Sequence, residues 1–96
     1  MSRDARVEGG WLLRRVQAGE KLSMPESRPL PAIDPRCHEL RINDLEKKLE
    51  WRLVYYVGYL AVAVLDIFVK KTRTTPVDVI EKCRRRLADF KRRDVP

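Results

Sequence analysis

The spacing of hydrophobic residues predicts a helix near the start of the chain, over residues 3–19. Apolar side chains recur on one broad face, as they do in a helix that packs against a core. This face is formed by Val7, Trp11, Leu12, Leu13 and Val16. Four prolines follow between residues 20 and 36. Because proline fixes φ and lacks an N–H donor, residues 20–36 are predicted to form an extended, Pro-rich loop.

The hydrophobic period changes to two after this loop, which predicts a three-stranded antiparallel meander over residues 37–69. In the first strand, one face carries His38, Leu40 and Ile42, and the other carries Glu39 and Arg41. Residues 51–57 are β-branched and aromatic, which is typical of a strand. Gly58 and Tyr59 are predicted to form a tight hairpin turn. The nearly continuous apolar run 60–69 favours a central strand that is covered on both faces.

Capping residues predict a second helix over residues 76–93. Thr75 fits the N-cap position and Pro76 the first helical position. The apolar stripe of this helix is formed by Ile80, Cys83, Leu87 and Phe90. The pattern as a whole predicts a single small α+β domain over residues 1–96, in which an N-terminal helix and a basic C-terminal helix pack on an antiparallel sheet.

A membrane span is the alternative interpretation of the longest apolar stretch, residues 53–69. Seventeen residues are the minimum for a spanning helix. Asp66 lies inside the stretch and would cost about 2.5–3.5 kcal/mol near the centre of a bilayer. Gly58 also interrupts the run at hairpin length. The sequence therefore favours strands and no membrane partner.

Charge is distributed unevenly along the chain, because the net charge of +7 comes almost entirely from the last quarter. Residues 70–93 contain 10 basic and 3 acidic side chains. Such an excess indicates a polyanionic partner, such as nucleic acid. A solvated basic face is the simpler interpretation of the same pattern.

The chain contains one histidine and two cysteines, Cys37 and Cys83, without a CxxC spacing. This composition predicts neither a metal site nor a disulfide framework, and we expect no cofactor. Two buried thiols are typical of a reducing compartment. The first residues include no apolar segment of the kind found in a signal peptide. The expected location is therefore the cytoplasm.

A set of cations near the predicted sheet forms the candidate functional site. Arg41 lies in the first strand and Arg52 in the second, and Lys70, Lys71 and Arg73 follow the third. A meander can bring these side chains together on one concave face. Such a cluster suits an RNA phosphate, because cations both neutralise the phosphate and stabilise the extra charge of a pentavalent transition state. Composition alone leaves RNA binding and RNA cleavage open.

Three segments, in this order, resemble the RelE/ParE superfamily of toxins. They are Cys37–Ile42, Trp51–Val57, and Phe68–Thr72 followed by Thr75 and Pro76. The sequence looks closest to the HigB-like, phage-derived branch, which has an ELR-type strand, a YRV-type strand and an F-x-KKT-x-x-TP segment before its last helix. Residues 13–19 are similar to the end of the first helix of the family. The resemblance covers about residues 5–92.

The resemblance implies the toxin of a type II toxin–antitoxin system. HigB and RelE relatives cut messenger RNA on the ribosome by attack of the ribose 2′-OH on the scissile phosphate, without a metal. The implied partners are the ribosome, mRNA and a cognate helix-turn-helix antitoxin, which forms a hetero-oligomer with the toxin. Relatives usually begin with a strand before the first helix. This sequence has none there, which leaves three explanations open: a misplaced start, a truncated protein, or a sheet that is one strand short.

Matching positions imply catalytic roles for Arg52, Arg41 and Lys71, with Arg52 stabilising the phosphate and its transition state. The general base is left open between Glu39, His38 and a lysine whose pKa is lowered by neighbouring cations. Each residue also has a structural interpretation. Glu39 can pair with Arg41, His38 can pack against its neighbours, and Arg52 can form a salt bridge to an acid such as Asp66.

Six further residues are expected to contact RNA or the ribosome. They are Lys70, Arg73, Arg84, Arg85, Arg86 and Tyr56. Tyr55 and Tyr56 point to opposite faces of their strand, so one is expected in the core while the other can stack on a base. The three consecutive arginines are expected to form a basic face that touches ribosomal RNA or the antitoxin.

Two alternatives to a nuclease remain. A ParE-like relative shares the fold but inhibits gyrase and lacks the cationic set. A phage accessory protein can bind nucleic acid without cutting it. The retained Arg41, Arg52 and Lys70–Lys71 pair favours the nuclease, whereas the absent first strand keeps the inactive nucleic-acid-binding relative open.

Overall fold

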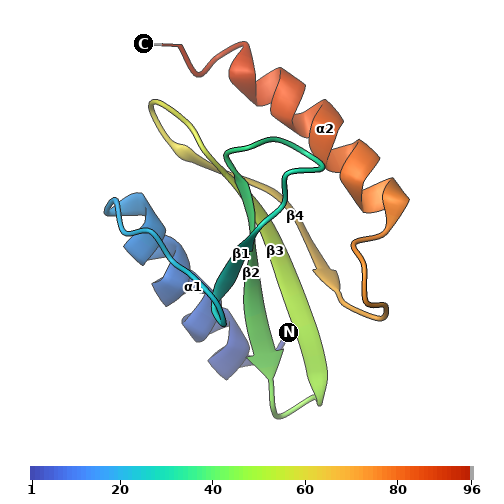
Figure 1. The fold of residues 1–96 in the computed structure, drawn as a ribbon. Helices are drawn as coiled ribbons and strands as arrows, with labels where there is room; N and C mark the ends of the chain where they lie inside the picture. Colours follow the sequence, from blue (N-terminus) through green and yellow to red (C-terminus); the bar gives the residue numbers. More distant parts are fainter. Residues whose placement is uncertain (96) are drawn as a thin grey trace.

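The computed structural model describes residues 1–95, which form two helices and a four-stranded antiparallel sheet (Figure 1). The elements follow in the order α1 (Arg3–Gln17), β1 (Ser27–Pro29), β2 (Cys37–Asp44), β3 (Leu49–Val57), β4 (Val62–Val69) and α2 (Val77–Lys91). The strands are arranged in the spatial order β1-β2-β3-β4. The expected small α+β fold, with one helix at each end of the chain, is confirmed.

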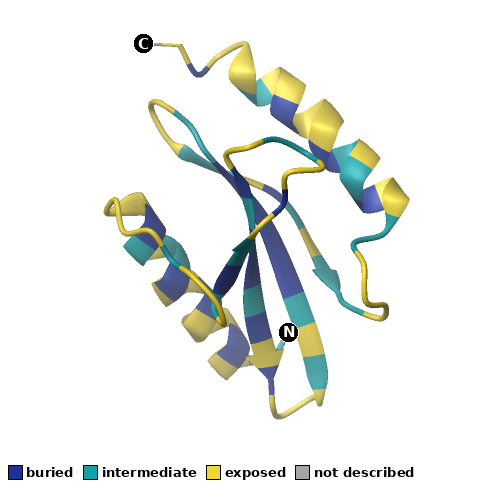
Figure 2. Cartoon of the chain, in the orientation of Figure 1, coloured by how far each residue is buried: buried dark blue, intermediate teal, exposed yellow. Residues whose placement is uncertain are grey.

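The sheet lies between the two helices, so each of its faces has its own core (Figure 2). On the α1 face, Leu12 and Val16 pack against Leu40, Ile42 and Tyr55. The other face packs against α2, through the buried residues Val54, Tyr56, Leu65, Val79, Cys83 and Leu87. Strand alternation therefore serves both cores, because successive side chains point to opposite faces. The opposite orientations predicted for Tyr55 and Tyr56 are confirmed.

Gly9 allows α1 to approach the sheet closely. A Cβ atom at this position would lie 2.7 Å from Cδ1 of Ile42 on β2. The absence of a side chain thus explains why a glycine is retained within a helix, although glycine lowers helix propensity.

The expectation of three strands was wrong, because β1 forms inside the Pro-rich segment. Its three residues pair with β2, with Arg28 opposite Glu39 and Pro29 opposite His38. Proline is tolerated in this position because β1 is an edge strand and needs few ladder donors. No strand precedes α1 among residues 1–95, and β1 supplies the fourth strand instead.

The interpretation of residues 60–69 as a central strand was also wrong. β4 lies at the edge of the sheet and pairs only with β3. On the α1 face, Val64 and Ile67 are 44% and 46% exposed, because α1 packs over β2 and leaves this side of the sheet uncovered. The apolar run reflects burial against α2 on the other face, where Leu65 belongs to the core.

The bounds of α2 and the turn between β3 and β4 differ from the sequence prediction. The N-cap of α2 is Pro76, which makes no side-chain capping hydrogen bond, and the helix runs from Val77 to Lys91. The hairpin between β3 and β4 has a four-residue connection, in which Gly58 N–H donates to the carbonyl of Ala61 at 3.0 Å. Neither helix among the described residues combines the length and apolarity needed to cross a membrane.

Candidate functional site

A buried carboxylate lies at the centre of the candidate site. Glu39 of β2 is 1% exposed. Its Oε1 atom lies 3.3 Å from Nε of Arg28 and 3.4 Å from Nε of Arg52. Thr75 Oγ1 donates a hydrogen bond of 3.3 Å to the other carboxylate oxygen, Oε2. One carboxylate therefore joins β1, β3 and the segment before α2.

Arg52 is held in place from several directions. Its side chain is 3% exposed. Nη2 donates to Oε2 of Glu50 at 3.2 Å, and Nη1 donates to the carbonyl of Trp51 at 3.0 Å. Arg41 lies directly opposite Arg52 in the β2–β3 pairing, so both arginines occupy the same face. A charge that is buried this deeply needs such partners, because desolvation of an isolated ion is costly.

Asp66 does not pair with Arg52, contrary to the structural interpretation of that arginine. Asp66 instead forms ion pairs with α2: its Oδ2 lies 3.5 Å from Nζ of Lys82, and its Oδ1 lies 3.5 Å from Nη1 of Arg86. These contacts tie α2 to β4. Glu39 likewise pairs with Arg28 and Arg52, rather than with the expected Arg41.

The cations meet at an open depression beside this cluster, which we call the cationic hollow. Its volume is about 560 Å³. It is lined by Arg41, Glu50, Arg52, Lys70, Lys71, Thr72 and Arg73. The five cations that the sequence placed near the sheet are thus brought together. Antiparallel pairing of β3 with β4 brings the end of β4 close to Arg52. Lys70 directly follows β4, and its N–H donates to Glu50 O at 2.8 Å.

Lys70 is a partly buried lysine of the cationic hollow. Burial lowers the pKa of its amine below the usual 10.5, and the nearby cations Arg52, Arg28 and Arg41 lower it further, while Glu39 opposes this shift. Lys71, by contrast, is exposed. Lys70 thus combines a lowered pKa with a position beside the cationic hollow.

His38 is not brought to this site. It lies on the α1 face of the sheet, where its ring stacks on Tyr55 with centroids 5.4 Å apart and an interplanar angle of 21°. Burial lowers the pKa of His38, which favours the neutral imidazole. The packed interpretation of His38 fits this position, since the sheet separates it from Arg41 and Arg52.

The remaining predicted contacts lie elsewhere. Tyr56 is buried, and its ring meets Phe90 edge-on at 5.9 Å, so little of it is free to stack on a base. Arg84 donates from Nε to the carbonyl of Ala32 at 3.1 Å. Arg86 donates to the carbonyl of Leu65 at 2.6 Å, on the opposite flank of α2. Arg85 is exposed. These arginines lie on α2 and do not line the cationic hollow.

Two residues that contact Glu39, namely Arg28 and Thr75, were not predicted from the sequence. Arg28 lies in the proline-rich segment, where no strand was expected. Thr75 was interpreted as a helix cap, yet its hydroxyl binds Glu39. Arg28 pairs with Glu39 across β1 and β2, and no local sequence pattern predicts a contact between residues so far apart in the chain. Among residues 1–95, no three His, Cys, Asp or Glu side chains are grouped as potential metal ligands.

Comparison with known proteins identifies the family. No curated protein sequence matches the chain significantly. The model of one family, described as phage derived protein Gp49-like (DUF891), matches residues 1–88. The match therefore includes both core faces of the sheet, the whole Glu39 cluster and the cationic hollow. This chain belongs to the phage-derived Gp49-like family.

Proposed function

We propose that this protein is the toxin of a type II toxin–antitoxin system, and that it cuts messenger RNA on the ribosome. The observation that carries the proposal is the cationic hollow, where Arg41, Lys70, Lys71 and Arg73 gather over the buried Arg52. Membership of the Gp49-like family and the resemblance to HigB-like toxins support the same function.

In the proposed reaction, the cationic hollow holds the scissile phosphate. The half-buried Arg41 contacts the phosphate directly, and Arg52 forms the floor and adds its charge. Both arginines favour the pentavalent transition state, which carries more negative charge than the bound diester. Lys71 and Arg73 are exposed at the rim and bind neighbouring phosphates.

Lys70 is the proposed general base. Its neutral amine takes the proton of the ribose 2′-OH, and the 2′-oxygen attacks phosphorus. The bond to the 5′-oxygen breaks, which leaves a 2′,3′-cyclic phosphate and a 5′-hydroxyl. Lys71 supplies the proton to the leaving oxygen. No cofactor takes part in this scheme. Glu39 is a positioning residue, because it is buried beneath the cations and holds Arg28 and Arg52.

The partners proposed with this function are the ribosome, its mRNA and a helix-turn-helix antitoxin, which is expected to form a hetero-oligomer with the toxin. Since ribosomes are the target, the protein would act in the cytoplasm. Arg84, Arg85 and Arg86 are proposed to touch ribosomal RNA or the antitoxin from α2, apart from the reaction itself.

Induced expression in a bacterial host, with mapping of new mRNA 5′ ends, tests this function. We expect growth arrest and cuts within translated messages, and purified protein should cut mRNA only when ribosomes are present. Arg41→Ala should abolish the cuts. Arg14→Ala is the matched control, because Arg14 is exposed on α1 and takes no part in the hollow. Growth arrest with intact messages would instead indicate a gyrase inhibitor, and normal growth a purely binding relative.

A further inference from the structure

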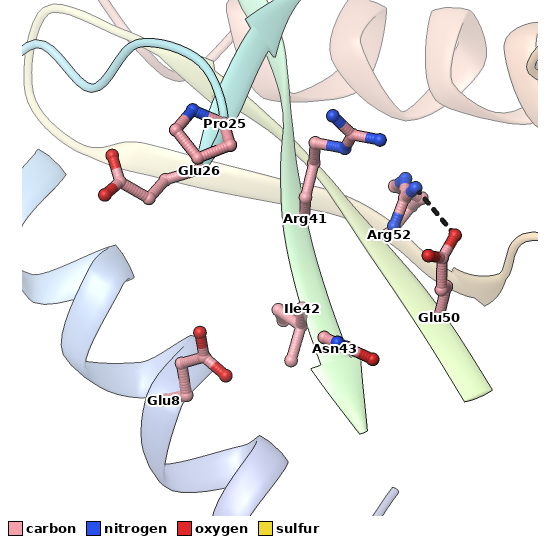
Figure 3. A pocket seen from close by; sticks show the side chains of 8 residues that line it. All are labelled: Glu8, Pro25, Glu26, Arg41, Ile42, Asn43, Glu50 and Arg52. Carbon is pink, nitrogen blue, oxygen red and sulfur yellow. Dashed lines mark hydrogen bonds and ion pairs between the residues drawn. The ribbon is translucent and has the colours of Figure 1, made fainter. Parts of the chain in front are cut away.

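A second depression adjoins the cationic hollow and has a different chemical character (Figure 3). Its volume is about 340 Å³. It is lined by Glu8, Pro25, Glu26, Arg41, Ile42, Asn43, Glu50 and Arg52. Three of these residues, Arg41, Glu50 and Arg52, also line the cationic hollow. We call this second depression the acidic hollow, because three carboxylates line it.

The short length of β1 creates the acidic hollow. β1 pairs with β2 only as far as Leu40, and beyond it the N–H of Arg41 still donates a backbone hydrogen bond to Glu26 O at 2.8 Å. From Ile42 onwards, β2 has no strand partner on the β1 side. Figure 3 shows Glu8 and Glu26 on one side of β2 in this view, and Arg41 and Arg52 on the other.

Two carboxylates that line the acidic hollow have no side-chain partner among residues 1–95. Glu8 and Glu26 take part in no side-chain hydrogen bond or ion pair with any of the residues 1–95. Arg52 Nε is buried and lies 3.4 Å from Oε1 of Glu39, so its charge is compensated within the fold. The unpartnered carboxylates of Glu8 and Glu26 are free to accept hydrogen bonds from a polar ligand. Glu50 differs from the other carboxylates, since it is bound to Arg52.

We infer that the acidic hollow binds one base of the RNA, next to the phosphate in the cationic hollow, and that it selects guanine. This inference rests on the proposed function. The two hollows share a wall, as is needed when a single nucleotide places its phosphate in one and its base in the other. The volume is near the lower end of the range of about 300–1,000 Å³ for small-ligand pockets, which suits a planar base.

Guanine fits the mixed charge of this hollow. Its N1–H and N2 amine form a pair of donors that one carboxylate can accept, and its O6 and N7 form a pair of acceptors that a guanidinium can bind. The carboxylate of Glu8 or Glu26 can accept hydrogen bonds from N1–H and the N2 amine, and the guanidinium of Arg41 can donate to O6 and N7. Adenine lacks a paired donor edge of this kind, and uracil and cytosine lack N7. A hollow with only cations would not discriminate in this way.

Two assays test the inference. The first maps cut sites in ribosome-bound mRNA and compares the frequency of guanine with that of adenine at each position beside the cut. The second measures binding of pentanucleotide RNAs by fluorescence anisotropy, with each ribose 2′-O-methylated so that no cleavage is possible. The probes differ only in having guanine or adenine at the central position. We expect the wild-type chain to prefer guanine by about tenfold in both assays.

The decisive variants are Glu8→Gln and Glu26→Gln, singly and together. The double variant should lose the guanine preference while it continues to cut and to bind, because the cationic hollow is intact. Glu46→Gln is the matched control, since Glu46 is exposed in the β2–β3 turn and removes the same charge outside the hollow. Its guanine preference should equal that of the wild type.

The outcomes separate the inference from the proposed function. A wild-type protein that cuts messages without a guanine preference, or a double variant that keeps the preference, overturns the base-reading role and leaves the nuclease intact. A protein that cuts no message refutes the proposed function. In that case the non-cleavable probes still decide the inference, because equal affinity for the guanine and adenine probes would overturn it.

Discussion

The Nε atom of Arg52 lies 3.4 Å from Oε1 of Glu39, and both side chains are almost completely buried within the α2 face of the sheet. Arg28 reaches the same oxygen atom from β1, at 3.3 Å. A single carboxylate therefore compensates two guanidinium groups beneath the cationic hollow. This arrangement couples the stability of the fold to the geometry of the site.

Glu39→Gln should destabilise the protein strongly. Glutamine keeps the approximate shape but removes the charge, which leaves the exposed Glu50 as the remaining ion paired with the buried Arg52. Breaking a buried pair in this way costs about 3–5 kcal/mol. Urea unfolding followed by circular dichroism measures the change. Glu46→Gln serves as the control and should alter the free energy of unfolding by less than about 0.5 kcal/mol. Equal stability of the two variants would show that the Glu39 pair contributes little.

Arg41→Ala should weaken RNA binding without a comparable loss of stability. Arg41 is half-buried and makes no side-chain ion pair with any of the residues 1–95, so its removal leaves no orphaned charge. If Arg41 contacts one phosphate, the slope of log affinity against log salt should fall by about 1. Binding of 2′-O-methylated RNA at a series of salt concentrations measures this slope. An unchanged slope would place Arg41 outside the phosphate contacts, and Arg14→Ala provides the reference for a cation elsewhere.

The pH dependence of cleavage should follow Lys70. Its pKa in the folded protein is lowered from 10.5, chiefly by burial, so the neutral amine is populated at a lower pH than in an ordinary lysine. The single-turnover cleavage rate on ribosomes should therefore rise with pH and level off above the lowered pKa. Lys70→Arg keeps a positive charge that does not titrate in this range, and it should abolish the rise. A wild-type rate that is flat with pH would exclude Lys70 as the base.

The same shift predicts the effect of Lys70 on stability. Between the lowered pKa of the folded state and 10.5, the unfolded chain binds more protons than the folded one. The free energy of unfolding should therefore increase with pH across this window. Comparison with Lys70→Met isolates the contribution, because methionine has a similar length and no titratable group. A difference between the two proteins that does not vary with pH would contradict the lowered pKa.

The strand alternation correctly separated His38 from Glu39, but it gave no measure of how deeply Glu39 is buried. That burial depends on β1 and on the segment before α2, which cover the carboxylate from distant parts of the chain. β1 was missed for the same reason. Its three residues contain Pro29 and carry no local strand signal, so only pairing with residues 38–40 defines it.

The run 60–69 illustrates a different limit of sequence reasoning. A long apolar stretch indicates burial, but it does not tell which strand lies at the edge of a sheet. β4 lies there because β1 occupies the side of β2 that β3 leaves free. The cationic set was predictable in part, because Arg41, Arg52 and Lys70 lie in or directly after regular strands. Glu8 and Glu26 were not, since α1 and the Pro-rich segment meet only in the folded chain.

The two cysteines should be unreactive in the folded protein. Cys37 and Cys83 are fully buried in the core between the sheet and α2. Burial raises the pKa of Cys37 to about 12 and that of Cys83 to about 11. Because the thiolate is the reactive form, an aromatic disulfide reagent at pH 8 should label neither thiol until urea unfolds the chain. Rapid labelling of one thiol under native conditions would indicate local opening of α2.

Gly58 and Asp94 should be energetically coupled, because they meet where the β3–β4 connection touches the segment after α2. Asp94 accepts hydrogen bonds of 2.7 Å from the N–H groups of both Tyr59 and Leu60. A Cβ atom on Gly58 would lie 2.4 Å from Oδ2 of Asp94 and 2.8 Å from the carbonyl of Ala61. Gly58→Ala should therefore destabilise the fold by about 1–3 kcal/mol, since the connection has to move and the hydrogen bonds weaken.

Thermal unfolding of four proteins tests this coupling: the wild type, Gly58→Ala, Asp94→Ala and the double variant. Part of the cost of Gly58→Ala should disappear in the Asp94→Ala background, because the closest clash is gone. Gly10→Ala is the matched control, since Gly10 lies in α1 with no atom within 4 Å of its Cβ position. That change should stabilise the protein by about 0.5–1 kcal/mol. Equal costs of Gly58→Ala in both backgrounds would show that Ala61 alone, and not Asp94, requires a glycine at this position.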